Sequence, residues 1–102
     1  MSATDYTIDL RDHRFVLFEQ LRIQDLEHPK FEDYGEDLYR MILEEARKFA
    51  EGTLAPINGP GDREGCHWED GQVTTPKGFK EVYRMFSEAG WGGMTLPAEV
   101  GG

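Results

Sequence analysis

Apolar residues recur at helical spacing in three separate stretches of the chain, which predicts three amphipathic helices and an all-α fold. The first stretch has apolar side chains three residues apart: Phe15, Phe18 and Leu21. This spacing predicts a helix over residues 11–23, ending before His28 and Pro29. Asp9 and Asp12 stand where carboxylates cap a helix or favour its positive end.

The second stretch has the clearest helical pattern. Its apolar stripe comprises Leu38, Ile42, Ala46, Phe49 and Ala50. Acidic residues within 33–36 suit the positive end of this helix. Pro56 disfavours helical geometry at Ala55 and is therefore expected to end the helix. Glu44 and Lys48 are four residues apart and are expected to pair on the opposite face.

A long loop is predicted between the second and third helices, because residues 57–75 contain several glycines and little periodicity. A turn, with a short hairpin as one possibility, is predicted at residues 69–72 within it. The third helix is predicted to begin at Thr75 and Pro76 and to end at a left-handed Gly90. Its apolar stripe, expected to be buried together, comprises Phe79, Val82, Tyr83 and Phe86.

The charge balance excludes some classes of partner. The 102 residues include 11 basic and 20 acidic groups, a net charge of −9, and such a field repels nucleic acid and anionic membranes. The longest uninterrupted aliphatic or aromatic run, Phe15–Phe18, is far shorter than the roughly 20 residues of a membrane span. Residues 1–9 are polar and acidic, unlike a secretory signal. The single cysteine, Cys66, cannot form an internal disulfide, so we expect a cytoplasmic location.

Metal binding is disfavoured by the spacing of the candidate ligands. The nitrogen and sulfur donors are His13, His28, Cys66 and His67. Adjacent side chains such as Cys66 and His67 point apart in an extended segment, and no closely spaced zinc pair occurs. Residues 62–70 supply carboxylates but depart from the calcium-loop pattern. We expect instead that Asp62 or Glu64 pairs with Arg63 or a neighbour and holds this segment.

Motifs for phosphate binding and nucleophilic catalysis are also missing from the sequence. The glycines of residues 59–61 are not followed by Gly-Lys-Ser/Thr, and those of residues 90–93 follow a helix instead of preceding one. No serine stands in a G-x-S-x-G motif. No pattern in the sequence supports a Cys66 thiolate activated by His67. The same holds for Glu44 and Glu45 as an acid/base pair. We therefore predict no catalytic, cofactor-binding or metal-ligating residue in this chain.

Several segments, in order, resemble the N-terminal helical domain of acyl-CoA dehydrogenases. These are residues 43–51, 54–58, 61–66, 73–83 and 88–91, and Pro97–Gly102, which is similar to the family's P-x-E-x-G-G element. Tyr6, Leu10–Asp12 and Arg14–Leu17 resemble the N-terminal extension of a subgroup that includes 3-methylmercaptopropionyl-CoA dehydrogenase-like enzymes. The resemblance implies an extension with the first helix in residues 1–30, and the N-terminal helical domain in residues 31–102.

The resemblance implies an FAD-dependent oxidoreductase that dehydrogenates an acyl-CoA thioester between its α and β carbons and passes electrons to an electron-transferring flavoprotein. In that family FAD lies mainly between a middle β domain and a C-terminal helical bundle, which carries a glutamate base. Neither domain is encoded in these residues, so we expect this chain alone to be inactive. Its helices would wall one side of the acyl-CoA cleft within a homo-oligomer, and Pro97–Gly102 would form a backbone corner. The alternative is a stand-alone helical interaction module without catalysis.

Overall fold

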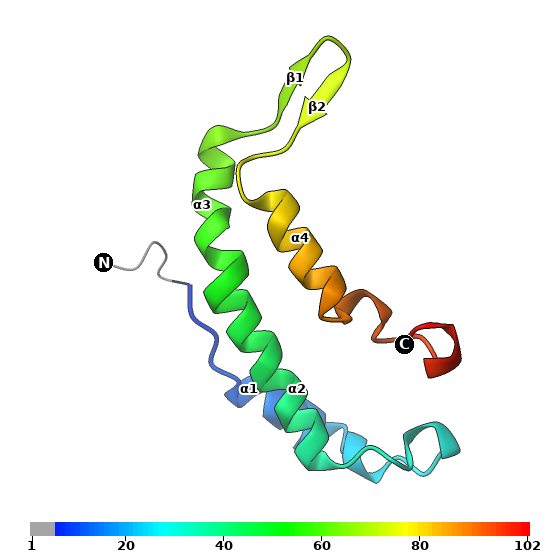
Figure 1. Ribbon diagram of the computed structural model, residues 1–102. Helices are drawn as coiled ribbons and strands as arrows, with labels where there is room; N and C mark the ends of the chain where they lie inside the picture. Colours follow the sequence, from blue (N-terminus) through cyan, green and yellow to red (C-terminus); the bar gives the residue numbers. More distant parts are fainter. Residues whose placement is uncertain (1–5) are drawn as a thin grey trace. The chain divides into compact units, whose positions relative to one another are not determined.

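The computed structural model describes residues 6–102, and the chain divides into two compact units, Met1–Thr53 and Leu54–Gly102. The described residues are mostly helical, as predicted, with one short hairpin (Figure 1). The α-helices, π-helices and strands are α1 (Arg11–Arg14), the π-helix η1 (Phe15–Gln20), α2 (Glu36–Phe49), the π-helix η4 (Ala50–Leu54), α3 (Ala55–Glu64), β1 (His67–Glu69), β2 (Gln72–Thr74) and α4 (Phe79–Glu88). Four 3₁₀ turns complete the order: η2 (Ile23–Asp25), η3 (Pro29–Phe31), η5 (Trp91–Gly93) and η6 (Ala98–Val100).

The first predicted helix is formed by α1 and η1 together. Asp9 lies just before its start and its Oδ1 accepts the amide of Arg11 at 3.0 Å, although the N-cap residue itself is Leu10. Its second half is a π-helix, in which hydrogen bonds span five residues and residues three apart no longer share one face. Consequently Phe18 is buried, whereas Phe15 is 54% exposed. The helix stops before Arg22, which has a φ of 51°, slightly earlier than predicted.

The second predicted helix, α2, begins at Glu36 in the acidic segment, as expected. Its predicted surface pair is wrong: Glu44 binds Arg47 and Arg14, and Lys48 lies 3.4 Å from Glu45. The two guanidinium groups give Glu44 charge-assisted hydrogen bonds. Because the Glu44 carboxylate accepts these bonds, it does not form the expected pair with Lys48.

The predicted end of this helix and the start of the long loop are also wrong. Helical backbone runs through η4 and α3 as far as Glu64, although Pro56 was expected to stop it at Ala55. Pro56 lies in the first turn of α3, where proline's missing amide is tolerated. The π-turn before it allows the hydrogen-bond pattern to change at this point. The connection between α3 and α4 is therefore shortened to residues 65–78.

The turn predicted at residues 69–72 is present and closes a hairpin of β1 and β2. The strands are antiparallel, with Trp68 opposite Val73. Asp70 and Gly71 both have positive φ, 51° and 77°, as a two-residue type I′ turn requires. The side chains of Trp68 and Val73 are 72% and 66% exposed.

The third predicted helix, α4, begins at Phe79, later than the Thr75–Pro76 start expected from the sequence. Gly78, with a φ of 91°, precedes it, and Gly90, with a φ of 85°, follows it as predicted. Phe79, Val82 and Phe86 are half-buried in the second unit. The expected burial of Tyr83 is wrong, since its side chain is 71% exposed. The apolar stripe is wider than the face that this unit covers.

Candidate functional site

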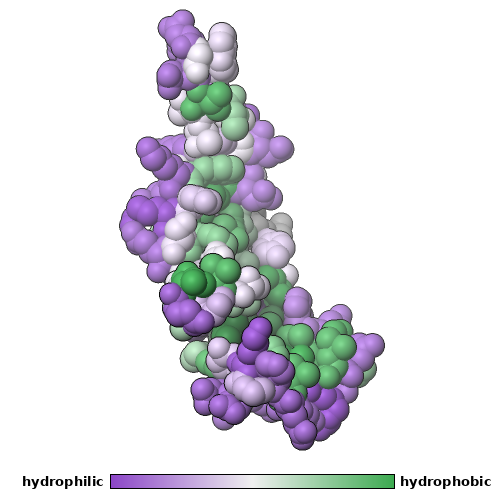
Figure 2. Space-filling model, turned by 90° about the vertical axis from the view of Figure 1, so that its right-hand side faces the viewer, coloured by the Kyte–Doolittle hydropathy of each residue, from purple (hydrophilic) through white to green (hydrophobic). Residues whose placement is uncertain are grey.

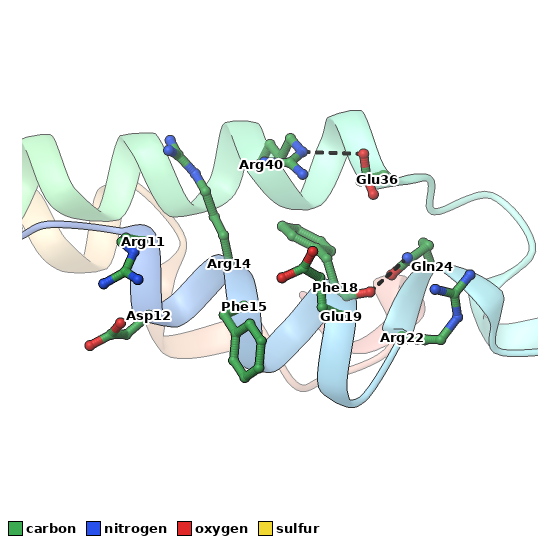
Figure 3. A pocket seen from close by; sticks show the side chains of 10 residues that line it. All are labelled: Arg11, Asp12, Arg14, Phe15, Phe18, Glu19, Arg22, Gln24, Glu36 and Arg40. Atoms are coloured by element: carbon green, nitrogen blue, oxygen red, sulfur yellow. Dashed lines mark hydrogen bonds and ion pairs between the residues drawn. The ribbon is translucent and has the colours of Figure 1, made fainter.

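The first unit contains an open groove of about 850 Å3, bordered by α1, η1, η2 and the start of α2 (Figure 3). Its lining includes the guanidinium groups of Arg11, Arg14, Arg22 and Arg40. In Figure 3 the side chain of Arg14 extends toward α2, and Phe18 lies between η1 and Arg40. The guanidinium carbon of Arg40 is 4.6 Å from the Phe18 ring centroid, a cation–π contact. Our expectations from the sequence, which included no site residue, did not anticipate this groove. The arginines at positions 11, 14, 22 and 40 were the features of the sequence that could have indicated it.

Most of the positive charge of this groove is already neutralised. Arg22 lies 2.6 Å from Asp25, and Arg40 lies 3.2 Å from Glu36. Arg14 lies 2.7 Å from Glu44. Within residues 6–102, Arg11 is the groove guanidinium without an ion-pair partner. The groove therefore offers little net attraction for a strongly anionic ligand.

Two buried polar atoms of the groove lack a hydrogen-bond partner within the described chain: Arg14 Nε and Gln24 Oε1. The amide of the Gln24 side chain is engaged, because its Nε2 donates to the Phe18 carbonyl at 3.0 Å. Buried polar atoms are almost always satisfied in folded proteins. The described chain therefore leaves the hydrogen bonding of this donor and this acceptor unsatisfied.

An alternating series of charged residues on α2 and η4 holds Ile8 and Arg14 of the first unit in place. Arg47 bonds Glu44 at 2.8 Å and Glu51 at 3.0 Å, and Glu51 Oε1 also accepts the Ile8 amide at 2.6 Å. The Arg47 hydrogen bond, with the charges of Arg47 and Arg14, lowers the pKa of Glu44. A carboxylate held ionised in this way is a poor proton acceptor. Glu44 therefore serves as a fixed anion that joins Arg14 to Arg47.

Replacing Glu44 by glutamine is expected to destabilise the chain in a pH-dependent way. Because the pKa of Glu44 is lower in the folded state, its stabilising effect is full above the unfolded-state pKa and disappears as the pH falls through the folded value. Urea unfolding followed by circular dichroism should show E44Q less stable than the wild type at pH 7, with a smaller difference at pH 3. E45Q, which loses only an exposed pair with Lys48, should change little. An equal E44Q difference at both pH values would contradict this role.

The candidate metal ligands are distributed without forming a cluster. His67 Nε2 lies 3.4 Å from Glu64 Oε2, and His28 Nδ1 accepts the Lys30 amide. The thiol of Cys66 is exposed. Over residues 6–102, no three His, Cys, Asp or Glu side chains meet in a group that could hold a metal ion. A search of the same residues also finds no helix with the length and apolar character that spanning a membrane requires.

Glu64 holds the base of the hairpin, as one of the two acidic residues proposed for this role. Its Oε1 accepts the amide of Lys77 at 3.1 Å, and its Oε2 lies 3.4 Å from His67 Nε2, so its partners are Lys77 and His67 and not Arg63. The bond to Lys77 joins the end of α3 to the segment before α4. The two ends of the hairpin segment are thereby held together, next to the helices of the second unit.

The segment Pro97–Gly102 forms the expected backbone corner. The Gly102 amide donates to the Pro97 carbonyl at 3.0 Å, and Gly101 adopts a φ of 98°. A Cβ added to Gly102 would overlap the Leu96 carbonyl, and one added to Gly93 would lie 2.9 Å from the Gly101 oxygen. Glycine is required here both by φ and by the close approach of the backbone. This corner is the structural counterpart of the P-x-E-x-G-G resemblance.

Comparison with known proteins shows which family this chain is similar to. A family profile described as acyl-CoA dehydrogenase, N-terminal domain, matches residues 36–102. The chain is 41% identical over 63 residues to 3-methylmercaptopropionyl-CoA dehydrogenase of Ruegeria pomeroyi, covering 62% of this chain and 11% of that protein. It is 34% identical over 107 residues to the broad-specificity linear acyl-CoA dehydrogenase of Mycobacterium tuberculosis, covering 93% and 18% respectively.

A third relative is butyryl-CoA dehydrogenase of Syntrophomonas wolfei, 32% identical over 97 residues that cover 90% of this chain and 16% of that protein. The chain thus spans between 11% and 18% of the length of these relatives. The predicted similarity to the 3-methylmercaptopropionyl-CoA dehydrogenase subgroup is confirmed by the first of them. The proposed division at residues 30 and 31, and the absence of site residues, stay predictions. The match over residues 36–102 shows that this chain belongs to the acyl-CoA dehydrogenase family.

Proposed function

We propose that this chain is the N-terminal helical part of an FAD-dependent acyl-CoA dehydrogenase. In the proposed reaction the α carbon of an acyl-CoA thioester loses a proton to a glutamate base and the β carbon loses a hydride, leaving an α,β double bond. FAD supplies the hydride acceptor when bound, and an electron-transferring flavoprotein then receives the two electrons. The observation that carries this proposal is the family match over residues 36–102.

The residues of this chain do not fit a flavin site. The diphosphate of FAD needs several free hydrogen-bond donors or positive charges. Of the four groove arginines, only Arg11 lacks a carboxylate partner among the described residues. The glycines of the Pro97–Gly102 corner are crowded by their own backbone. We therefore assign no step of the reaction to a residue of this chain, and place flavin binding and proton abstraction in parts of the family fold outside it.

The role that we propose for this chain is to form one wall of the acyl-CoA cleft by packing against the rest of the enzyme. Both units expose large apolar side chains, which supports a packing role. Examples are Met41, Tyr83 and Met94, which are 55%, 71% and 62% exposed. Figure 2 shows apolar side chains reaching the surface among hydrophilic ones.

The acyl group of the substrate is left open in this proposal, because the three relatives are named for different acyl-CoA substrates. A cytoplasmic location and a homo-oligomeric enzyme belong to the same proposal. The stand-alone interaction module is the competing function, and the exposed apolar side chains are compatible with it as well.

The test compares this chain with a longer chain that continues into the middle and C-terminal domains of the family. We expect the 102-residue chain to purify without flavin absorbance and to give no dehydrogenation of 3-methylmercaptopropionyl-CoA or butyryl-CoA with an artificial electron acceptor. The longer chain should contain about one FAD and oxidise at least one of these substrates.

Stoichiometric flavin in the short chain, together with turnover of an acyl-CoA, would refute the proposal that flavin binding and catalysis lie outside these 102 residues. A longer chain that folds and holds FAD, but oxidises no acyl-CoA of any chain length, would refute the proposed activity itself. The interaction module would be favoured if no longer form of the protein exists in cells.

A further inference from the structure

Four rings form a continuous row in the first unit, on the connector before α2 and on the first turn of that helix. The aromatic row consists of His28, Phe31, Tyr34 and Tyr39. Successive ring centroids are 5.9, 6.4 and 6.3 Å apart, and all three pairs are tilted or edge-on. Phe31 and Tyr34 are 38% and 46% exposed, so the row presents its rings at the surface instead of filling the core.

The aromatic row is held in place by its own backbone. The His28 side chain accepts the Lys30 amide at 3.1 Å and caps the η3 turn. The Phe31 amide donates to the His28 carbonyl at 2.8 Å, and the Tyr34 amide donates to the Phe31 carbonyl at 3.0 Å. Because successive turns fix the spacing of the rings, a ligand would meet a preformed surface and would lose less entropy in ordering it.

Unpaired negative charge surrounds the aromatic row. Residues 27–37 contain five carboxylates and a single cationic side chain, Lys30. Glu36 pairs with Arg40, while the other four carboxylates are exposed and have no ion pair within the described residues. These four are Glu27, Glu32, Asp33 and Asp37. An aromatic face attracts a cation through its quadrupole, and nearby carboxylates add long-range attraction.

We propose that the aromatic row is a docking surface for a lysine- or arginine-rich segment of a partner protein. The rings would receive cationic side chains on their faces, and the four unpaired carboxylates would pair with further cations along the same segment. Four rings spread along an open surface match several cations on one chain better than a single small cation, which is bound by rings that enclose it. The net charge of −9 favours the approach of such a partner.

The probe for this surface is a ten-residue oligolysine peptide, titrated into the full 102-residue chain while NMR shifts of the aromatic protons are followed. We expect saturable shifts in His28, Phe31, Tyr34 and Tyr39, and weaker binding as salt rises. The variants F31L and Y34L keep an apolar side chain but remove the ring. Each is expected to weaken binding about two- to five-fold, the range for an exposed cation–π contact.

Y83L is the matched control, because Tyr83 is more exposed than Tyr34 and also stacks on a second ring, Phe86, at 6.5 Å. The carboxylates nearest along its helix, Glu81 and Glu88, are both paired with Arg84. Y83L should therefore bind the peptide as the wild type does. Circular dichroism of each variant checks that it remains folded.

The double variant E32Q/D33N tests the charges separately and should weaken binding and flatten its salt dependence. Unchanged affinity in F31L and Y34L, or an equal loss in Y83L, would overturn the proposal, since attraction would then follow net charge alone. Titration with tetramethylammonium chloride tests whether the aromatic row binds a small cation instead of a protein segment. If it gives the same shifts at the same charge concentration, the row is a small-cation site and the proposed protein partner is wrong.

Discussion

Replacing Phe18 by alanine is expected to cost about 3–5 kcal/mol and to unfold the first unit near physiological temperature. Phe18 is only 3% exposed, and the described part of the chain buries just two other aliphatic or aromatic side chains, Leu10 and Ala55. Small domains have stabilities near the lower end of about 5–15 kcal/mol, so this loss approaches the total. The variant also loses the cation–π contact with Arg40.

Phe15→Ala is the matched control for this prediction. It removes the same side chain three residues away in the same helical stretch, but Phe15 is 54% exposed and its loss should cost less than about 1 kcal/mol. Urea unfolding monitored by circular dichroism measures both variants, and Phe18→Leu gives an intermediate value if F18A is already unfolded. Equal losses for F15A and F18A would show that the π-helical twist of η1 does not select the buried ring.

The parts of the fold that the sequence predicts correctly are those decided by local chemistry. The start of α2 follows from the acidic segment before Leu38 and from a stripe at helical spacing. The hairpin turn follows from Asp70 and Gly71, because few other residue pairs adopt two successive positive φ angles. Gly90 ends α4 for the same reason.

The parts that the sequence does not predict depend on hydrogen-bond partners chosen by the fold. A strict 3.6-residue period cannot reveal the π-helices η1 and η4, which turn Phe15 to the surface and bring Pro56 into a tolerated position. Tyr83 has the spacing of a core residue, yet the second unit does not cover it. Burial is decided by which face finds a partner, and periodicity alone shows only which face is apolar.

The candidate groove illustrates the same limit for function. Four arginines are visible in the sequence, but only coordinates show that Asp25, Glu36 and Glu44 neutralise three of them. The ordered resemblance to a family carries more functional information than any single residue here, since the family match covers residues 36–102. That is the expected outcome for a segment whose proposed contribution is packing, because packing leaves no catalytic motif to find.

Gly61→Ala is expected to destabilise the second unit by about 1–3 kcal/mol, although alanine is the better helix former. Gly61 is buried in α3, and a Cβ there would overlap the ring of Phe79 at the start of α4. The ring or the helix must move, so the contact between α3 and α4 is lost or strained. Unfolding of the variant in urea measures the cost.

Gly59→Ala supplies a control with the opposite sign in the same helix. Its added Cβ would lie 3.4 Å from Arg63 Nη1, the end of a flexible side chain, so the helical preference for alanine should stabilise the chain by about 0.5–1 kcal/mol. The double variant G61A/F79L then assigns the cause. Because leucine lacks the ring edge that a Cβ at residue 61 meets, the double variant should lose less stability than the sum of G61A and F79L. Strict additivity would mean that Gly61 is needed for some reason other than the approach of Phe79.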